Sequence, residues 1–149
     1  MRAFLAFPLS EATRKKIHLF TQEFSSAIRG KWTPVPVQNI HLTTHFFPHL
    51  TEEGVKKIME YVPEPLSRFE PFSFSISYFG VFPEFSSPRV LWLGVNEGKE
   101  TLIRIKKTLD EVLNQLNLDY DEKEFHPHIT FGRVKGAEHL LLAILGPHQ

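Results

Sequence analysis

The sequence contains no cysteine, and this absence removes several kinds of chemistry. Disulfide bonds, thiolate metal sites and a cysteine nucleophile are all excluded. Long apolar runs are also missing, since none approaches the roughly 20 residues that a membrane-spanning helix needs. Residues 1–16 are followed by no signal-peptide cleavage pattern. These absences predict a cytoplasmic protein with no membrane partner.

An excess of charge of either sign is missing as well. The 17 Lys and Arg residues balance 17 Asp and Glu residues, and no long basic block occurs. Proteins that track long duplexes usually carry a basic stripe, because phosphate neutralisation supplies much of their affinity. If this chain binds nucleic acid, we therefore expect it to bind an end or a short piece.

What is present indicates an ordinary globular domain. The 149 residues are 42% hydrophobic and include 14 Phe, so the chain is long enough and apolar enough to bury a core. We expect one domain over residues 1–149.

The periodicity of apolar residues predicts an α+β fold with helices packed on antiparallel sheet. Helices are expected after the N-cap residues Ser10 and Thr51 and in the long amphipathic segment 97–118, whose apolar stripe comprises Leu102, Ile105, Leu109, Val112 and Leu116. Pro63 and Pro65 are expected to close the second helix. Strands are expected over residues 1–7, 40–47, 71–82, 88–95 and 125–135.

Two of these strands carry the same short motif, His-x-Thr. The first is His41-Leu42-Thr43 and the second is His128-Ile129-Thr130. Each half of the chain thus contains a strand, a long helix and then a His-x-Thr strand, which suggests an ancient duplication with two lobes.

The motif offers an imidazole and a hydroxyl side by side. Residues i and i+2 of a strand point to the same face, so His41 projects with Thr43, and His128 with Thr130. Imidazole titrates near neutral pH, so one ring can act as a general base while the other acts as a general acid. Hydroxyl groups can donate hydrogen bonds to phosphate oxygens as charge develops there. The pattern favours phosphodiester cleavage without a metal ion, although a single such motif arises easily by chance.

A metal site is the competing hypothesis. His41, His45 and His49 are spaced by four residues, which would stack three ligands on a helix. The Thr and Phe content of this stretch and Pro48 argue against a helix. We therefore expect no metal and no other cofactor.

Taken together, the two motifs and their surroundings resemble a known family. The stretches "RAFLAFPLSEATRKKI", "KWTPVPVQNIHLTTHFF", "FSISYFGVFPEFSSPRVLWLGV" and "FHPHITFGRVK" cover most of the first 135 residues. They are similar to the two-histidine phosphoesterase superfamily, and within it to the LigT-like RNA 2',3'-cyclic phosphodiesterases, also called 2'-5' RNA ligases. The resemblance implies a bilobal, pseudo-twofold α+β fold, with two antiparallel sheets lining a central cleft and helices outside.

The resemblance also implies a reaction and its residues. Such enzymes open a terminal RNA 2',3'-cyclic phosphate to a 2'-phosphate, and some join or cleave 2'-5' linkages in tRNA fragments. Carried over by motif position, His41, Thr43, His128 and Thr130 are the catalytic residues, and Arg133 helps to hold phosphate, unless it is simply a surface residue at a strand end. The near symmetry of the motifs leaves open which histidine is the acid.

Further contacts with substrate are expected from residues near the motifs. His45 shares the face of His41 if the strand is regular, at a position where the family more often has Lys or Arg. The rings of Phe7, Trp32 and Phe46 are candidates for stacking on a base, with core packing as the alternative. Tyr78 and Trp92 are expected in the core.

The C-terminal end departs from the family pattern. Relatives usually continue further, whereas here "GAEHLLLAILGPHQ" closes the sequence, with a short helix expected over residues 137–145. We expect a monomer, with a dimer through an exposed C-terminal edge as the alternative. Ligation of a cyclic phosphate to a 5'-hydroxyl, and RNA-end binding without catalysis, remain alternative functions. The expected partners are RNA ends, with no obligatory protein partner.

Overall fold

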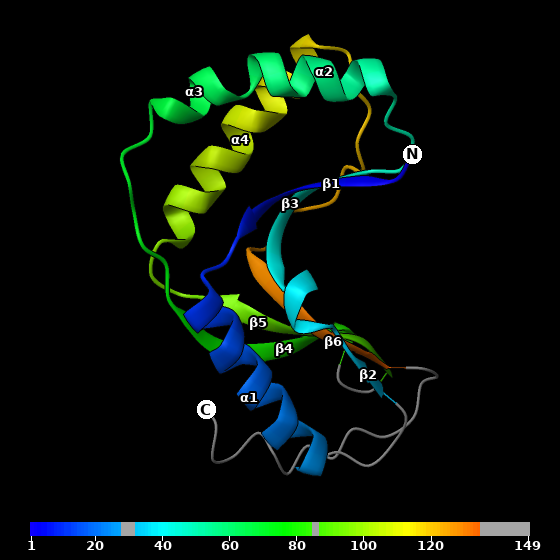
Figure 1. The fold of residues 1–149 in the computed structure, drawn as a ribbon, viewed down its shortest axis with the longest axis vertical. Coiled ribbons are helices and arrows are strands. Elements are labelled where there is room, and N and C mark those ends of the chain that lie inside the picture. The colour runs from blue at the N-terminus through cyan, green and yellow to red at the C-terminus, as the bar shows by residue number, and fades with distance from the viewer. Residues whose placement is uncertain (28–31, 85–86, 135–149) are drawn as a thin grey trace. The chain divides into compact units, whose positions relative to one another are not determined.

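The computed structural model describes residues 1–27, 32–84 and 87–134. These residues form both helices and antiparallel strands, which confirms the α+β class (Figure 1). The elements are β1 (Ala3–Pro8), α1 (Glu11–Ala27), β2 (Trp32–Pro34), the 3-10 helix η1 (Val37–Asn39), β3 (His41–Phe47), α2 (Glu52–Tyr61), α3 (Pro63–Ser67), β4 (Ile76–Glu84), β5 (Ser87–Val95), α4 (Lys99–Gln115) and β6 (His128–Val134). The helix expected over residues 137–145 and the C-terminal edge lie outside the described residues.

Two helices begin at the residues that the sequence indicates. The Ser10 hydroxyl accepts a hydrogen bond from the backbone N–H of Thr13 at 3.1 Å, at the start of α1. The Thr51 hydroxyl accepts one from the N–H of Gly54 at 3.0 Å, at the start of α2. Each bond satisfies a backbone donor that has no partner within its helix. None of the helices in the described ranges is long and apolar enough to cross a membrane.

The segment after α2 confirms one expectation and adds a helix. α2 ends at Tyr61, just before Pro63, as expected; Pro63 then begins the short helix α3, with Val62 between the two helices. The reason is that proline is tolerated in the first turn of a helix, where its missing N–H would have no intrahelical partner. A second, short helix therefore follows α2 directly, without a loop between them.

Within the described residues, six strands form two sheets. The larger sheet has the order β2-β6-β5-β4, and each neighbouring pair in it is antiparallel. The smaller sheet pairs β1 with β3. Here Met1 exchanges hydrogen bonds with Leu50, whereas Leu5 meets Thr44, so the two strands run in opposite directions. Two antiparallel sheets were expected, and this is confirmed.

The strand expected from residue 71 is shorter than its alternating pattern suggested. β4 begins at Ile76, and Ser75 instead exchanges backbone hydrogen bonds of 3.0 Å with Glu97 and Asn96. Tyr78, expected in the core, is 44% exposed. Alternation of Phe and Ser over residues 72–75 therefore does not by itself make a strand, because no neighbouring strand pairs with it.

The chain divides into two compact units that interleave along the sequence. Unit 1 comprises residues 1–6, 43–75 and 96–127, and unit 2 comprises residues 7–42, 76–95 and 128–149. This partition does not test the duplication that the sequence suggests, which stays a prediction.

The core of unit 2 lies between α1 and the four-stranded sheet, with Phe24 of the helix at its centre. Its ring lies 5.2 Å from that of Phe131 on β6 and 5.7 Å from that of Phe79 on β4, both edge to face. Phe20, one turn earlier, also meets Phe131 edge to face at 5.4 Å. Such edge-to-face pairs add to the stabilisation from burial.

The core of unit 1 is built on α4. Its buried residues are Leu102, Ile105, Leu109 and Leu113. The first three were expected. Leu113 is buried in place of the expected Val112, which is half-buried, and the expected Leu116 is half-buried at the C-cap of the helix. Leu113 packs in a cluster with Phe47 and Leu50.

Replacing Leu113 with Ala tests this core. Leu113 is fully buried, so the substitution should lower the free energy of unfolding by about 2–5 kcal/mol through lost contacts and a cavity. Ile103→Ala is the matched control on the same helix, because Ile103 is 42% exposed and its truncation should cost far less. Urea unfolding of both variants measures this, and equal losses would contradict the assigned packing.

Candidate functional site

Strand β6 separates polar from apolar side chains. Ile129 and Phe131 are fully buried, while His128 and Thr130 are only half-buried. Alternation along the strand explains this: the apolar residues face the α1 side and the two polar residues face the other side of the sheet. The predicted pairing of His128 with Thr130 on one face is confirmed.

A register shift brings Arg133 to this same face. Thr130 lies opposite Trp92 of β5, but Gly132 lies opposite Leu91 and Arg133 opposite Val90, so β6 has one extra residue at this point. Strict alternation would place Arg133 on the α1 side. A bulge of this kind re-aims the following side chains, and Arg133 is accordingly exposed while Gly132 is buried.

Two aromatic rings from neighbouring strands contact His128. The Phe82 ring on β4 lies 5.2 Å from the imidazole, edge to face, and the Trp92 ring lies 6.0 Å from it. Phe82 and Trp92 stack on each other at 5.0 Å. These apolar contacts restrict the orientation of the imidazole. The sequence placed Trp92 in the core; the register opposite Thr130 places it on the His128 face instead.

Glycines on β4 and β5 make room for these rings. A Cβ atom at Gly80 would lie 2.4 Å from the Trp92 ring, and one at Gly94 would lie 2.2 Å from the Tyr78 ring. Tyr78 in turn meets Trp92 edge to face at 5.8 Å. The two glycines explain how three aromatic side chains lie across one sheet face. The sequence analysis did not predict Phe82 and Trp92 as neighbours of His128. The pairing of β4 with β5 places both rings on one face of the sheet, so a correct hairpin register would have predicted them.

The first motif lies at the start of β3. His41 and Thr43 are half-buried and flank Leu42, which is fully buried, as is Ile129 in the second motif. Ile40, before the motif, is 2% exposed. The same alternation of inward apolar and outward polar residues therefore occurs in both motifs.

His45 does not lie at an exposed rim. It is 2% exposed, its Nε2 lies 2.6 Å from Asp110 Oδ1, and its Nδ1 lies 2.9 Å from Thr44 Oγ1. Both ring nitrogens are therefore engaged inside unit 1, which contradicts the expected exposed contact. Asp110 on α4 is the partner of the buried imidazole. Because Asp110 lies far from His45 in the sequence, the residue spacing along β3 does not predict this contact.

The alternative metal hypothesis required a helix that the structure does not have. Residues 41–47 form strand β3, so His41, His45 and His49 do not stack at helical spacing. Within residues 1–27, 32–84 and 87–134, no three His, Asp or Glu side chains are grouped to hold a metal ion.

The aromatic residues expected to stack on a base are placed differently from one another. Trp32 meets Phe24 and Phe131 edge to face at 5.5 and 6.4 Å, so it lies on the α1 side, away from His128. Phe46 is half-buried on β3; its ring lies 4.9 Å from that of Phe4, and the Arg2 guanidinium lies 5.2 Å from its centre. Trp32 therefore packs within the fold, whereas the expected role of Phe46 stays a prediction. Phe7 is half-buried near the end of β1, and its expected role stays a prediction.

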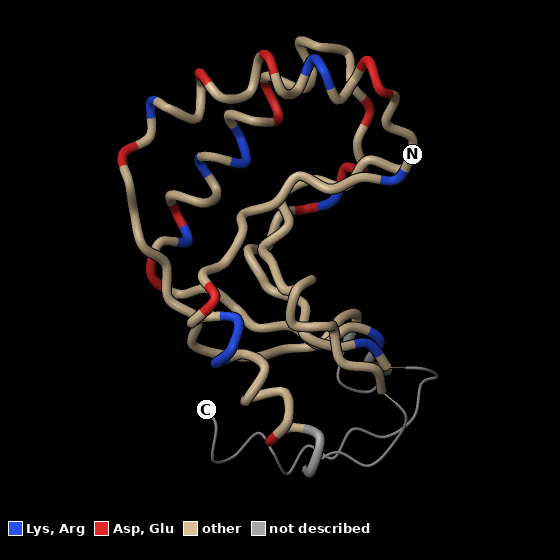
Figure 2. Tube along the Cα trace, in the orientation of Figure 1, with Lys and Arg blue, Asp and Glu red and all other residues tan. Residues whose placement is uncertain are grey.

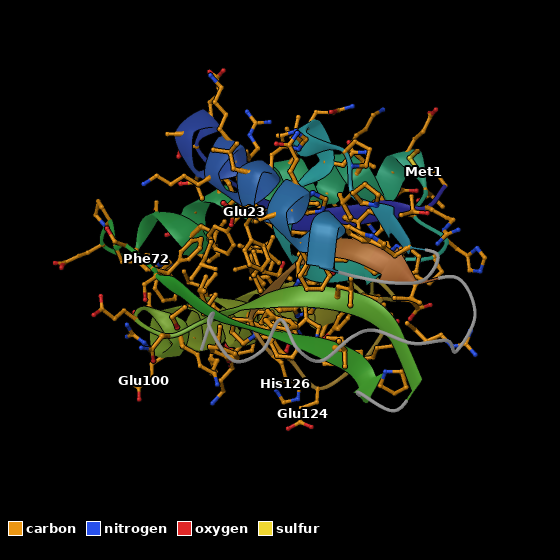
Figure 3. The ribbon with its side chains drawn as sticks, turned by 90° about the horizontal axis from the view of Figure 1, so that it is seen from below. Met1, Glu23, Phe72, Glu100, Glu124 and His126 are labelled. Carbon is orange, nitrogen blue, oxygen red and sulfur yellow. The ribbon has the colours of Figure 1, made fainter. Side chains whose placement is uncertain are left out.

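Another histidine lies just before β6. His126 and Glu124 are neighbours on the preceding segment, with Nε2 and Oε2 3.5 Å apart, and both side chains point outward (Figure 3). The side chain of His126 is 56% exposed. His126 therefore lies at the surface of the described part of the chain.

Comparison with known proteins gives a consistent picture. The model of the 2'-5' RNA ligase superfamily matches residues 15–145. A protein of Thermotoga maritima named RNA 2',3'-cyclic phosphodiesterase is 35% identical over 135 residues, which cover 91% of this chain and 71% of that protein. One of Archaeoglobus fulgidus with the same name is 36% identical over 135 residues, covering 91% and 73% of the two chains.

Solved structures have the same fold. The crystal structure of the Thermus thermophilus protein TT0787 superimposes with a TM-score of 0.78 at 29% identity, over 94% of this chain and 78% of that one. Escherichia coli LigT complexed with 3'-AMP superimposes with a TM-score of 0.67 at 25% identity, over 91% and 72%.

Gly80→Ala tests the aromatic face. The added methyl would overlap the rigid Trp92 ring, so we expect a loss of about 1–3 kcal/mol in stability and a changed Trp fluorescence spectrum. Gly54→Ala is the control, because its new Cβ would meet the movable end of Leu50 at 2.8 Å. Its effect should be smaller; a neutral Gly80→Ala in urea unfolding would contradict the close approach of the ring.

Proposed function

Because the chain belongs to the 2'-5' RNA ligase superfamily, we propose that it is a metal-independent RNA 2',3'-cyclic phosphodiesterase. It opens a terminal 2',3'-cyclic phosphate to a 2'-phosphate. The observation that carries the proposal is the matched pair of His-x-Thr strands, each with half-buried His and Thr flanking a fully buried apolar residue. The names of relatives about 35% identical over most of the chain support it.

Two imidazoles supply the proton transfers of this reaction. His128 removes a proton from the attacking water as its oxygen bonds to phosphorus. His41 donates a proton to O3' as the bond between phosphorus and O3' breaks, which leaves a 2'-phosphate and a free 3'-hydroxyl. One neutral and one protonated imidazole are needed at the start, and their states are exchanged at the end. Both histidines belong to unit 2.

Hydroxyl and guanidinium groups hold the phosphate. Thr43 and Thr130 donate hydrogen bonds to its non-bridging oxygens, where charge builds up as water attacks. Arg133 adds a positive charge on the His128 face, since the β6 bulge turns it to that side. The stacked Phe82 and Trp92 rings limit the rotation of His128 and keep it oriented for proton transfer.

The charge distribution favours a small ligand. Lys and Arg are mixed with Asp and Glu along α2 and α4, so both signs occur on each of these helices (Figure 2). Affinity for a long nucleic acid depends on many phosphate contacts, whereas a terminal cyclic phosphate needs few. The substrate is therefore an RNA end or short oligonucleotide, such as a tRNA fragment.

The ligase direction is the second candidate function. The superfamily's name and the cyclic phosphate chemistry favour it, because a 5'-hydroxyl can replace water as the attacking group. Water is present at far higher concentration than any RNA end, so hydrolysis dominates. Binding without catalysis is the third candidate.

His41→Ala and His128→Ala should each lower kcat on a 2',3'-cyclic nucleotide by about 10²–10⁴-fold, because each removes a general acid or base. His18→Ala is the control: His18 is exposed on α1 and its loss should leave turnover unchanged. Near-normal turnover by either of the first two variants would rule out paired acid–base catalysis.

Turnover should persist in excess EDTA, with a 2'-phosphate as the product. Identification of the product by NMR or chromatography separates hydrolysis from ligation, which would give a longer RNA. Binding with no product supports the binding module, and activity lost on chelation and restored by zinc supports the metal hypothesis.

A further inference from the structure

The buried His45 side chain forms part of a continuous polar chain inside unit 1. Asp110 on α4 contacts His45 Nε2 at 2.6 Å, and His45 Nδ1 contacts the Thr44 hydroxyl at 2.9 Å. The Thr44 hydroxyl lies 3.0 Å from the carbonyl oxygen of Leu5 on β1. The chain thus links α4 through β3 to β1, immediately after Thr43.

The protonation state of His45 determines which hydrogen bonds form in this series of polar groups. A hydroxyl has one hydrogen, so Thr44 can donate either to Leu5 or to His45, but not to both. When His45 is charged, both of its nitrogens donate: one to Asp110 and one to Thr44, whose own hydrogen then goes to Leu5. When His45 is neutral, the carboxylate of Asp110 requires the hydrogen on Nε2. Nδ1 then accepts from Thr44, and the bond between Thr44 and Leu5 is lost.

We propose that His45 is a positioning residue for Thr43. Its protonation directs the Thr44 hydroxyl hydrogen to the carbonyl oxygen of Leu5, and this hydrogen bond, the clamp, holds β3 against β1 beside Thr43. This proposal rests on the proposed function in so far as Thr43 contacts the phosphate. The clamp depends on Leu5, Thr44, His45 and Asp110, and it acts on the strand that carries Thr43. His45 itself touches no substrate.

The groups around His45 determine the pH range in which its imidazole is protonated and the clamp forms. Burial lowers the pKa of His45, which outweighs the opposite effect of its hydrogen bond to Asp110; Lys106 on α4 also lowers it. Lys106 Nζ lies 2.6 Å from the same Asp110 oxygen. Desolvation acts to raise the pKa of Asp110, but the hydrogen bonds from Lys106 and His45 lower it overall, which favours the charged carboxylate.

Tyr120 covers the other side of the imidazole. Its ring meets that of His45 edge to face at 4.9 Å and also lies 5.5 Å from the Lys106 ammonium. Burial raises the pKa of Tyr120, so the phenol stays neutral over the range in which His45 titrates. Asp110, Lys106 and Tyr120 thus surround His45 with one negative, one positive and one neutral group.

The clamp can be observed without any assay of activity. In ¹⁵N NMR of the full chain, His45 should titrate below pH 6.5, with its neutral form carrying hydrogen on Nε2. The backbone amide signals of residues 5 and 43 should shift with the same midpoint in the wild type, and should not do so in Thr44→Val. A neutral form with hydrogen on Nδ1, or amide signals that ignore the His45 midpoint, would overturn the clamp.

Stability gives a second measurement of the same group. Because the pKa of His45 is lower in the folded state, the unfolded chain takes up its proton first as pH falls below about 6.5. The free energy of unfolding should therefore decrease from about pH 6.5 down to the folded-state pKa of His45. His45→Gln should lack this contribution, whereas His49→Gln, at an exposed position, should retain it. If the free energy of unfolding depended on pH in the same way in wild type and His45→Gln, the lowered pKa could not be assigned to His45.

Turnover then tests the consequence for Thr43. The ratio of wild-type kcat to that of His45→Gln should rise as pH falls through the NMR midpoint, with little change in KM, because Thr43 acts on charge that develops during reaction. The ratio of wild type to His49→Gln should stay flat. In Thr44→Val, which keeps the imidazole but has no hydroxyl to switch, the rise should disappear.

The two proposals fail in different ways. A wild-type protein that opens no cyclic phosphate would overturn the proposed function, whatever the NMR titration shows. A normal kcat whose ratio to His45→Gln does not change with pH would overturn the positioning role alone.

Discussion

Alternation along a strand is the constraint on which the rest of this structure depends. Ile129 and Phe131 pack toward α1, and that burial forces His128 and Thr130 onto the opposite face of the sheet. A slip of one residue would bury two polar groups and expose two apolar ones, so the core of unit 2 and the orientation of the motif stabilise each other. The motif is thus a consequence of how the core is packed.

The bulge in β6 shows why local alternation is not sufficient. One extra residue between Thr130 and Arg133 brings a guanidinium to the same face as an imidazole and a hydroxyl. Gly132 permits this, because a Cβ there would lie 2.6 Å from the Trp32 ring. The bulge therefore places Gly132 in the packing on the α1 side and Arg133 on the opposite face, with His128 and Thr130.

The two histidines of β3 have opposite environments although both are on one strand. His41 is half-buried between inward apolar residues, whereas His45 is enclosed and paired with Asp110. A buried imidazole beside a carboxylate is costly unless every nitrogen has a partner, and Thr44 supplies the second one. On the same strand, one histidine is therefore partly accessible and the other is bonded internally.

The sequence by itself determined the α+β class, the caps at Ser10 and Thr51, most of the α4 stripe and the pairing of each His with its Thr. All of these depend on spacings of two to four residues, which short-range geometry controls. The tertiary structure alone decided that Trp92 and Phe82 flank His128, that Arg133 shares its face and that His45 is buried. Each of these depends on strand register or on a partner far along the chain, such as Asp110, and local periodicity carries no information about such contacts.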